Sequence, residues 1–132
     1  MSKNTVWAGV VLAGLTGPAA MMPAQAHHSF PATYNVGETV KIEGTVSAFL
    51  FRNPHSFVHI DVKDKSGNTV RWGVEWGGGG ALSGQGVAKD TVKRGDFVVV
   101  TGSPARDSSS HRLVMKSIVR PKDGWKWAGS FN

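Results

Sequence analysis

The stretch Thr-Val-Lys-Ile-Glu-Gly-Thr-Val-Ser-Ala-Phe-Leu-Phe, residues 39–51, decides the fold class of this chain. The apolar residues Val40, Ile42, Val46, Ala48 and Leu50 fall on even positions, and polar residues such as Lys41 and Glu43 alternate with them. A period of two places successive side chains on opposite faces of an extended strand. The pattern therefore predicts a β-strand with one buried face and one exposed face.

Further stretches of the chain repeat this alternation. After the break at Asn53-Pro54, a second strand is predicted over residues 57–62 and a third over 70–76. The turn between them, at 64–68, contains Gly67 and Asn68, which tolerate the positive φ angles of tight hairpins. Glycines 77–80 end the third strand, and residues 81–85 suffice for one or two helical turns. Two more strands are predicted over 97–101 and 113–120, with a polar loop at 103–110, while 125–127 are too few to assign.

This order of elements is that of a five-stranded Greek-key barrel of the oligonucleotide/oligosaccharide-binding (OB) type, with one short helix between the third and fourth strands. A small β-sandwich can have the same order and stays open as an alternative. In the barrel the following residues are expected to be buried: Val40, Ile42, Val46, Val58, Ile60, Val70, Val74 and Val98.

The first 26 residues are typical of a cleavable signal peptide. Lys3 precedes an apolar run over 6–15, and Ala24-Gln25-Ala26 provides the small side chains that signal peptidase requires. The run is shorter than the roughly 20 residues that span a bilayer, so no transmembrane segment is expected in the mature chain. We therefore predict a periplasmic or secreted protein with a single domain over 27–132 that begins at His27. Without any cysteine, the domain cannot be stabilised by disulfides.

The charge of the chain is basic but dispersed. The formal net charge is +6, and the lysines and arginines are scattered along the sequence. Such scatter is typical of a solvated surface more than of a nucleic-acid-binding stripe. We therefore expect no nucleic acid as a partner.

Several short segments together carry a resemblance to a known family. They are His27-His28-Ser29-Phe30, Gly44-Thr45-Val46, Asn53-Pro54-His55, Asp61-Val62-Lys63-Asp64 and Lys93-Arg94-Gly95-Asp96. In this order they resemble the bacterial exported family called domain of unknown function 6152. The resemblance implies an exported small β-barrel domain and no assigned activity. The chain departs from the family at residues 76–80, where Trp-Gly-Gly-Gly-Gly replaces a more polar entry to the short helix.

The predicted mature N-terminus is a candidate metal site. Cleavage after Ala26 would leave His27 with a free amine, so that its amine and imidazole nitrogens can chelate one ion, and His28 adds a second imidazole. Nitrogen ligands of this kind suit Cu(II) best among the common divalent ions. His55 follows the Asn53-Pro54 turn and is the candidate third ligand from the domain. A frayed terminus without a metal is the alternative.

A second set of candidates would bind a ligand at the surface: Phe57, His59 and Trp76. His59 lies about 13 Å along the strand from His55, at ~3.3 Å per residue, and is too distant to share its metal. Aromatic rings on such barrels can stack on sugars or bases. Trp72 and Trp76 are in register with Val70 and Val74, however, and suit the core equally well.

No arrangement of residues indicates an enzyme. The serines at 108–110 lie in a loop without the glycines of a nucleophile elbow, and there is no thiol. Glu43, Asp61 and Glu75 alternate with apolar residues and are expected to point to water. We predict a binding protein that takes up copper. The alternatives are a metal-free module that binds an envelope polymer or a protein and, last, a copper brace for oxidative chemistry on a polymer.

Overall fold

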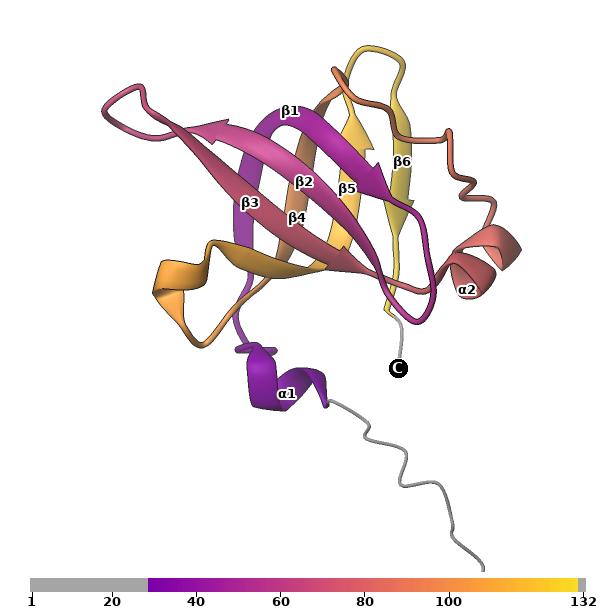
Figure 1. Cartoon of the computed structure of the whole chain (residues 1–132), viewed down its shortest axis with the longest axis horizontal. Helices are drawn as coiled ribbons and strands as arrows, with labels where there is room; N and C mark the ends of the chain where they lie inside the picture. Colours follow the sequence, from indigo (N-terminus) through magenta and orange to yellow (C-terminus); the bar gives the residue numbers. More distant parts are fainter. Residues whose placement is uncertain (1–28, 131–132) are drawn as a thin grey trace, which may run out of the picture.

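The computed structural model describes residues 29–130, which form a small β-barrel with short helices (Figure 1). The strands are β1 (Val40–Leu50), β2 (Ser56–Lys63), β3 (Thr69–Trp76), β4 (Phe97–Pro104), β5 (Arg112–Arg120) and β6 (Trp125–Ala128). The helices are α1 (Phe30–Thr33), α2 (Gly79–Gly84) and the 3-10 turn η1 (Ser108–Ser110). Among the described residues, no helix has the length and apolarity that crossing a membrane requires.

Five strands close the barrel. Their order is β3-β2-β1-β4-β5, and a parallel pairing of β3 with β5, from Gly73↔Arg112 to Glu75↔Val114, joins the two ends. β1 pairs with β4 over its first half and with β2 over its second half. Gly44 lies at this change of partner, where a Cβ would come within 2.3 Å of the carbonyl oxygen of Asp61. The barrel prediction is thus confirmed, with the short helix between β3 and β4.

The core lies inside the barrel and follows the predicted alternation. Val58, Ile60 and Val74 have no exposed surface, and Ile42, Val46 and Val98 are also buried. The prediction was wrong for Val40 and Val70, which are only half-buried because they lie at the beginning of their strands. Leu82 of α2 belongs to the same core cluster.

The structure extends the predicted elements toward the C-terminus. β4 continues to Pro104 instead of ending at Thr101, so the predicted 103–110 loop is shorter. The unassigned tail forms β6, which pairs with β5 from Ser117↔Ala128 to Arg120↔Trp125. Trp127 of β6 is 8% exposed and packs edge-on against Trp76, with 5.1 Å between the ring centroids.

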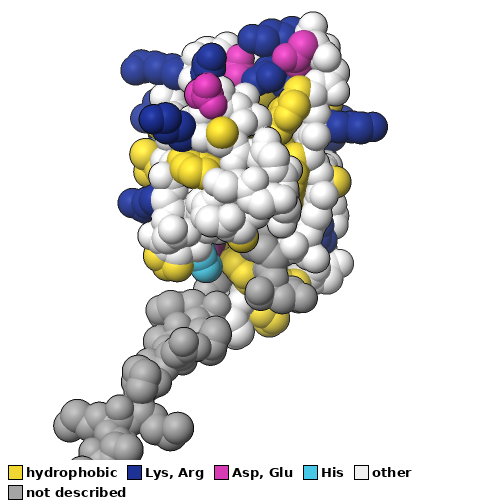
Figure 2. Space-filling view, turned by 90° about the vertical axis from the view of Figure 1, so that its right-hand side faces the viewer, with side chains coloured by type: hydrophobic (Ala, Val, Ile, Leu, Met, Phe, Trp, Pro, Cys, Tyr) yellow, Lys and Arg dark blue, Asp and Glu magenta, His cyan; other side chains and the backbone are white. Residues whose placement is uncertain are grey.

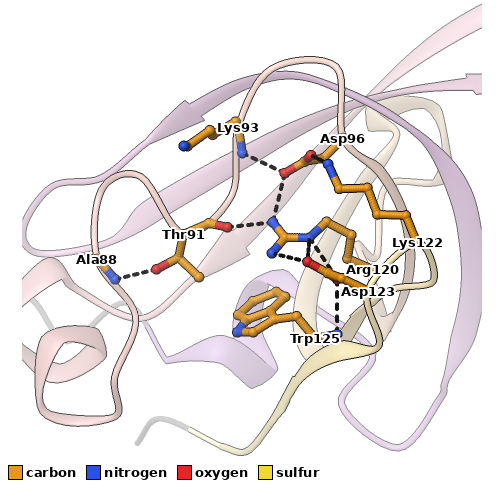
Figure 3. A network of polar contacts seen from close by, with 8 residues as sticks. All are labelled: Ala88, Thr91, Lys93, Asp96, Arg120, Lys122, Asp123 and Trp125. Atoms are coloured by element: carbon orange, nitrogen blue, oxygen red, sulfur yellow. Dashed lines mark hydrogen bonds and ion pairs between the residues drawn. The ribbon is translucent and has the colours of Figure 1, made fainter.

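A polar network ties the connection between α2 and β4 to the turn between β5 and β6 (Figure 3). Asp96 is its centre and is 6% exposed. Its carboxylate accepts hydrogen bonds from Arg120 Nη1 at 2.9 Å, Lys122 Nζ at 2.8 Å and the Lys93 backbone N at 3.0 Å. Arg120 also donates to the Thr91 carbonyl oxygen at 2.7 Å. Burial disfavours ionisation of Asp96, but the hydrogen bonds from Lys122, Lys93 and Arg120 outweigh it and lower its pKa to about 2.

Candidate functional site

A buried carboxylate on the outside of the barrel is the centre of the candidate site. Glu75 lies in β3 between Val74 and Trp76, whose side chains are in the core, so its own side chain points outward. It is nevertheless buried, with only 8% of its surface exposed. It is covered from outside by residues of other segments: Tyr34 after α1, His55 before β2 and Arg112 at the start of β5. The expectation that Glu75 points to water was therefore wrong, because the N-terminal segment covers this part of the outer wall.

Three donors converge on Glu75. Its Oε2 accepts the hydroxyl hydrogen of Tyr34 and a hydrogen bond from Arg112 Nη2 at 3.3 Å. Its Oε1 contacts Nδ1 of His55. An ionised carboxylate can only accept hydrogen bonds, so in the neutral ring of His55 the proton lies on Nδ1 and the lone pair on Nε2.

The ring of His55 is also held by an aromatic neighbour. Phe30 of α1 stacks on it with 5.5 Å between the ring centroids and an interplanar angle of 20°. The His55 side chain keeps 35% of its surface exposed. One edge of the imidazole is thus fixed by Glu75, and part of the ring is open to solvent.

The environment of Glu75 keeps the neighbouring phenol neutral. Burial, followed by the hydrogen bond to Glu75, raises the pKa of Tyr34 well above its ordinary value. Arg112 lies over the Tyr34 ring at 5.9 Å and over the Phe57 ring at 5.5 Å. Tyr34 therefore acts as a donor and Arg112 as the permanent cation of the cluster.

The glycine run after β3 positions the loop that carries His55. Gly79 N donates to the Arg52 carbonyl oxygen at 3.0 Å, and Gly80 N donates to Asn53 Oδ1 at 3.2 Å. A Cβ on Gly78 would lie 2.5 Å from the carbonyl oxygen of Pro54, next to His55 in the chain. The absence of a side chain at Gly78 thus allows the loop to pack against the entry to α2.

The other predicted site residues are dispersed. His27 and His28 lie outside the described residues, and His59 is half-buried on β2. Phe57 is half-buried opposite Glu75 and has Arg52 at 5.6 Å and Arg112 at 5.5 Å over its ring. The prediction that Trp76 binds a ligand at the surface was wrong. Trp76 has no exposed surface and cannot stack on a ligand, because its side chain points into the barrel.

Tyr34, Glu75 and Arg112 were not predicted as members of this site. No local pattern marks them, because the segments that bring them together are 37 and 41 residues apart in the chain. Between residues 29 and 130, no three His, Cys, Asp or Glu side chains come together as a metal site. His55 and Glu75 are the pair of such residues at the candidate site.

The charges on the surface are mixed in sign. Figure 2 shows lysine and arginine side chains spread over one face, with acidic side chains among those at its upper end. This view shows no continuous basic stripe, in agreement with the scatter along the sequence.

Solved structures resemble the barrel at low sequence identity. Two crystal structures of Rim1, a mitochondrial single-stranded DNA-binding protein from S. cerevisiae, match with a TM-score of 0.47 each. One is 18% identical and aligns over 61% of this chain and 90% of its own, and the other is 17% identical over 70% and 97%. No curated protein matches the sequence.

The expectation of no nucleic-acid partner is withdrawn, because both matching structures are of a protein that binds single-stranded DNA. Scattered charge argues against a basic stripe, but it does not exclude binding through stacked bases. At these identities the likeness concerns the fold alone.

One family model covers most of the chain. It describes a family of unknown function, DUF6152, and it matches residues 17–114. The match includes the β1–β3 sheet, the loop with His55, and Tyr34, Glu75 and Arg112 of the candidate site. The chain therefore belongs to the family of unknown function DUF6152.

Proposed function

We propose that this chain is an exported small-barrel protein that binds Cu(II) through His27 at its mature N-terminus, with His28 and His55 as further ligands. The single observation that carries the proposal is the fixed ring of His55, held by Glu75 at Nδ1 and by Phe30 at its face. The proposed role is binding, without a chemical reaction.

The contact between Glu75 and His55 suits a metal ligand. Histidines that bind metals almost always donate their other ring N–H to a carboxylate or carbonyl, which sets the tautomer and orients the ring. Glu75 accepts a hydrogen bond from Nδ1–H of His55 and is itself held by Tyr34 and Arg112. Nε2 of His55 is then the nitrogen available for a metal ion.

The N-terminal histidines are within reach of this nitrogen. Phe30 is stacked on His55, and His27 precedes Phe30 by three residues. Three residues span at most about 11 Å when extended, at 3.3–3.6 Å each, so the chain cannot carry His27 further than that from Phe30. Cleavage after Ala26 would thus leave the predicted chelate a short length of chain away from the residue that stacks on His55.

The ligand set favours copper among the divalent ions. An amine and imidazoles are nitrogen donors, and affinity for such donors is greatest for Cu(II) in the first-row series. Both kinds of nitrogen must lose protons to coordinate, with ordinary pKa values near 8 for the amine and 6.5 for the imidazole. Affinity should therefore fall steeply as the pH is lowered from about 7 to about 5.

The test is a calorimetric titration of the exported protein with Cu(II), after intact-mass analysis has established whether it begins at His27. The protein should bind one ion, and one additional residue before His27 should weaken binding strongly, because it replaces the amine by an amide. His55→Ala should weaken binding as well, whereas His59→Ala serves as the matched control and should not. Equal affinity of the extended and unextended proteins would refute copper binding at the N-terminus. Loss through His27→Ala with no effect of His55→Ala would instead reduce the site to a terminal chelate without the barrel.

A further inference from the structure

The barrel has a hollow at the end away from α2, beside the β2–β3 hairpin, and His111 at the end of η1 also lines it. Its volume is about 510 Å³, within the range of typical small-ligand pockets, and Ile42, Val62, Val70 and Trp72 form its apolar lining. We call it the end hollow. Leu82 of α2 packs with Trp76 and Trp127 in the core, and in Figure 1 the β2–β3 hairpin projects on the side away from α2.

The apolar lining continues the interior of the barrel. Ile60 pairs with Trp72, and Val62 pairs with Val70 across the β2–β3 hairpin. These residues have the same parity as the buried Val58 and Val74, so their side chains point inward. Trp72 and Val70 remain half-buried, whereas Val74 and Trp76, further along β3 on the same face, have no exposed surface. The last layer of the core is therefore accessible from this end.

The rim of the end hollow is basic. It carries Lys41, Lys63 and Lys65 against Glu43 and Asp64. Asp64 is occupied by its own turn, where it accepts hydrogen bonds from Ser66 N at 2.8 Å and Asn68 N at 2.9 Å. Among the described residues, neither Lys41 nor Lys65 forms an ion pair. An anionic group at the rim would therefore meet lysines that have no acidic partner.

We infer that the end hollow binds a small amphipathic anion, with the apolar body against Trp72 and Val62 and the carboxylate at Lys41 and Lys65. Apolar pockets with a few polar groups at the opening orient such ligands by burying the body and pairing the head group. The inference is independent of the copper proposal, since none of these residues belongs to the Glu75 cluster.

The probe is decanoate, titrated into the metal-free exported protein and followed by calorimetry, with decyltrimethylammonium as the ligand of opposite charge. Decanoate should bind with a stoichiometry of one and the cation should not. Lys41→Glu should weaken decanoate binding roughly 3- to 5-fold, the effect expected of one exposed charge. Lys126→Glu on β6 is the matched control and should leave the affinity unchanged.

Two further variants locate the ligand. Trp72→Leu should weaken decanoate binding about tenfold through lost apolar contact, and Lys65→Glu tests the rim without touching the core. His55→Ala should have no effect on decanoate, which separates this site from the proposed copper site. Absence of decanoate binding, equal binding of the cation, or binding that neither Lys41→Glu nor Lys65→Glu weakens would overturn the inference.

Discussion

The carboxylate of Glu75 contacts Nδ1 of His55, although the two residues are 20 positions apart in the chain. Glu75 belongs to a strand of the barrel wall, and His55 to the loop that precedes the neighbouring strand. The contact forms because the antiparallel pairing of β2 and β3 places Ser56 opposite Trp76. His55 and Glu75 each precede one member of this pair by one position, so both lie on the opposite, outer face and meet diagonally across the two segments. The strand fixes the carboxylate, and the carboxylate in turn orients the imidazole.

Glu75→Gln should disturb this orientation while preserving the shape of the side chain. The amide oxygen accepts hydrogen bonds more weakly than the carboxylate, and the amide NH2 turns a donor toward groups that are themselves donors: Tyr34, His55 and Arg112. The free energy of unfolding should therefore fall by about 1–3 kcal/mol. Metal affinity should fall by about 10- to 100-fold, the usual effect of losing a group that orients a ligand. Glu43→Gln is the matched control, because Glu43 is exposed on β1.

Denaturant unfolding, Cu(II) titration and imidazole 15N shifts measure these effects. The shifts should show that the Nδ1–H tautomer of His55 predominates in the unaltered protein and is lost in Glu75→Gln. If both variants kept the same tautomer and affinity, Glu75 would have no role in orienting His55.

The phenol of Tyr34 should resist ionisation in the folded protein. Burial and the hydrogen bond to Glu75 raise its pKa, and Tyr34 is the only tyrosine of the chain, so phenolate absorbance reports on it alone. The folded protein should show no phenolate signal near pH 10, where the unfolded chain titrates with an ordinary pKa of about 10.

The sign of the pH effect follows from the raised pKa of Tyr34. Because the folded state favours the neutral phenol, this contribution to stability is complete below the unfolded pKa and is lost as the pH rises through the folded one. Absorbance titration with and without denaturant checks it. A folded protein whose tyrosine ionised together with that of the unfolded chain would contradict the buried hydrogen bond.

The alternation of residues predicted the barrel strands well because it records which face of each strand is buried. It could not predict β6, because residues 125–128 are too few to show a period, and their strand depends on pairing with β5. Alternation also could not identify a stacking face: it placed Trp76 correctly on the same face as Val74, and this face is the core.

The candidate site was predictable only in part for a related reason. The sequence singled out His55 because it follows Asn53-Pro54, a local turn signal. Glu75 was assigned to the outer face of its strand, which is correct, but whether an outer face is wet depends on what covers it. Tyr34, which does so, comes from a segment 41 residues away, and no local pattern contains this distance.

Asp96→Asn should weaken the network that joins the α2–β4 connection to the β5–β6 turn (Figure 3). The pKa of Asp96 is lowered to about 2 from an ordinary 3.8, so its contribution to stability is present above pH 3.8 and is lost as the pH falls through about 2. At pH 7 the variant should be less stable by roughly 1–2 kcal/mol, a value reduced for the exposed Lys122 partner.

Urea unfolding of both proteins between pH 2 and pH 7 measures this difference. The gap in unfolding free energy between Asp96→Asn and the unaltered protein should narrow below pH 4. Asp90→Asn, at an exposed position of the same connection, should leave stability unchanged across this range. A gap that stayed constant down to pH 2 would mean that the charge of Asp96 does not stabilise the network.

Gly78→Ala should displace the loop that carries His55. The new Cβ would lie 2.5 Å from the Pro54 carbonyl oxygen and 2.9 Å from Asn53 Oδ1, and a backbone carbonyl cannot move aside without moving its loop. We expect a loss of about 1–3 kcal/mol in unfolding free energy, as for other forced contacts in packed regions, together with weaker Cu(II) binding.

Gly80→Ala is the matched control, since its Cβ would be 3.9 Å from Asn53 Oδ1, an ordinary contact, and alanine favours the helix that Gly80 belongs to. Chemical denaturation and metal titration of the two variants give the comparison. If Gly78→Ala lost stability but kept full copper affinity, the loop would stabilise the barrel without positioning His55, and if it matched Gly80→Ala in both measurements, the close approach of this loop to the glycine run would have no consequence.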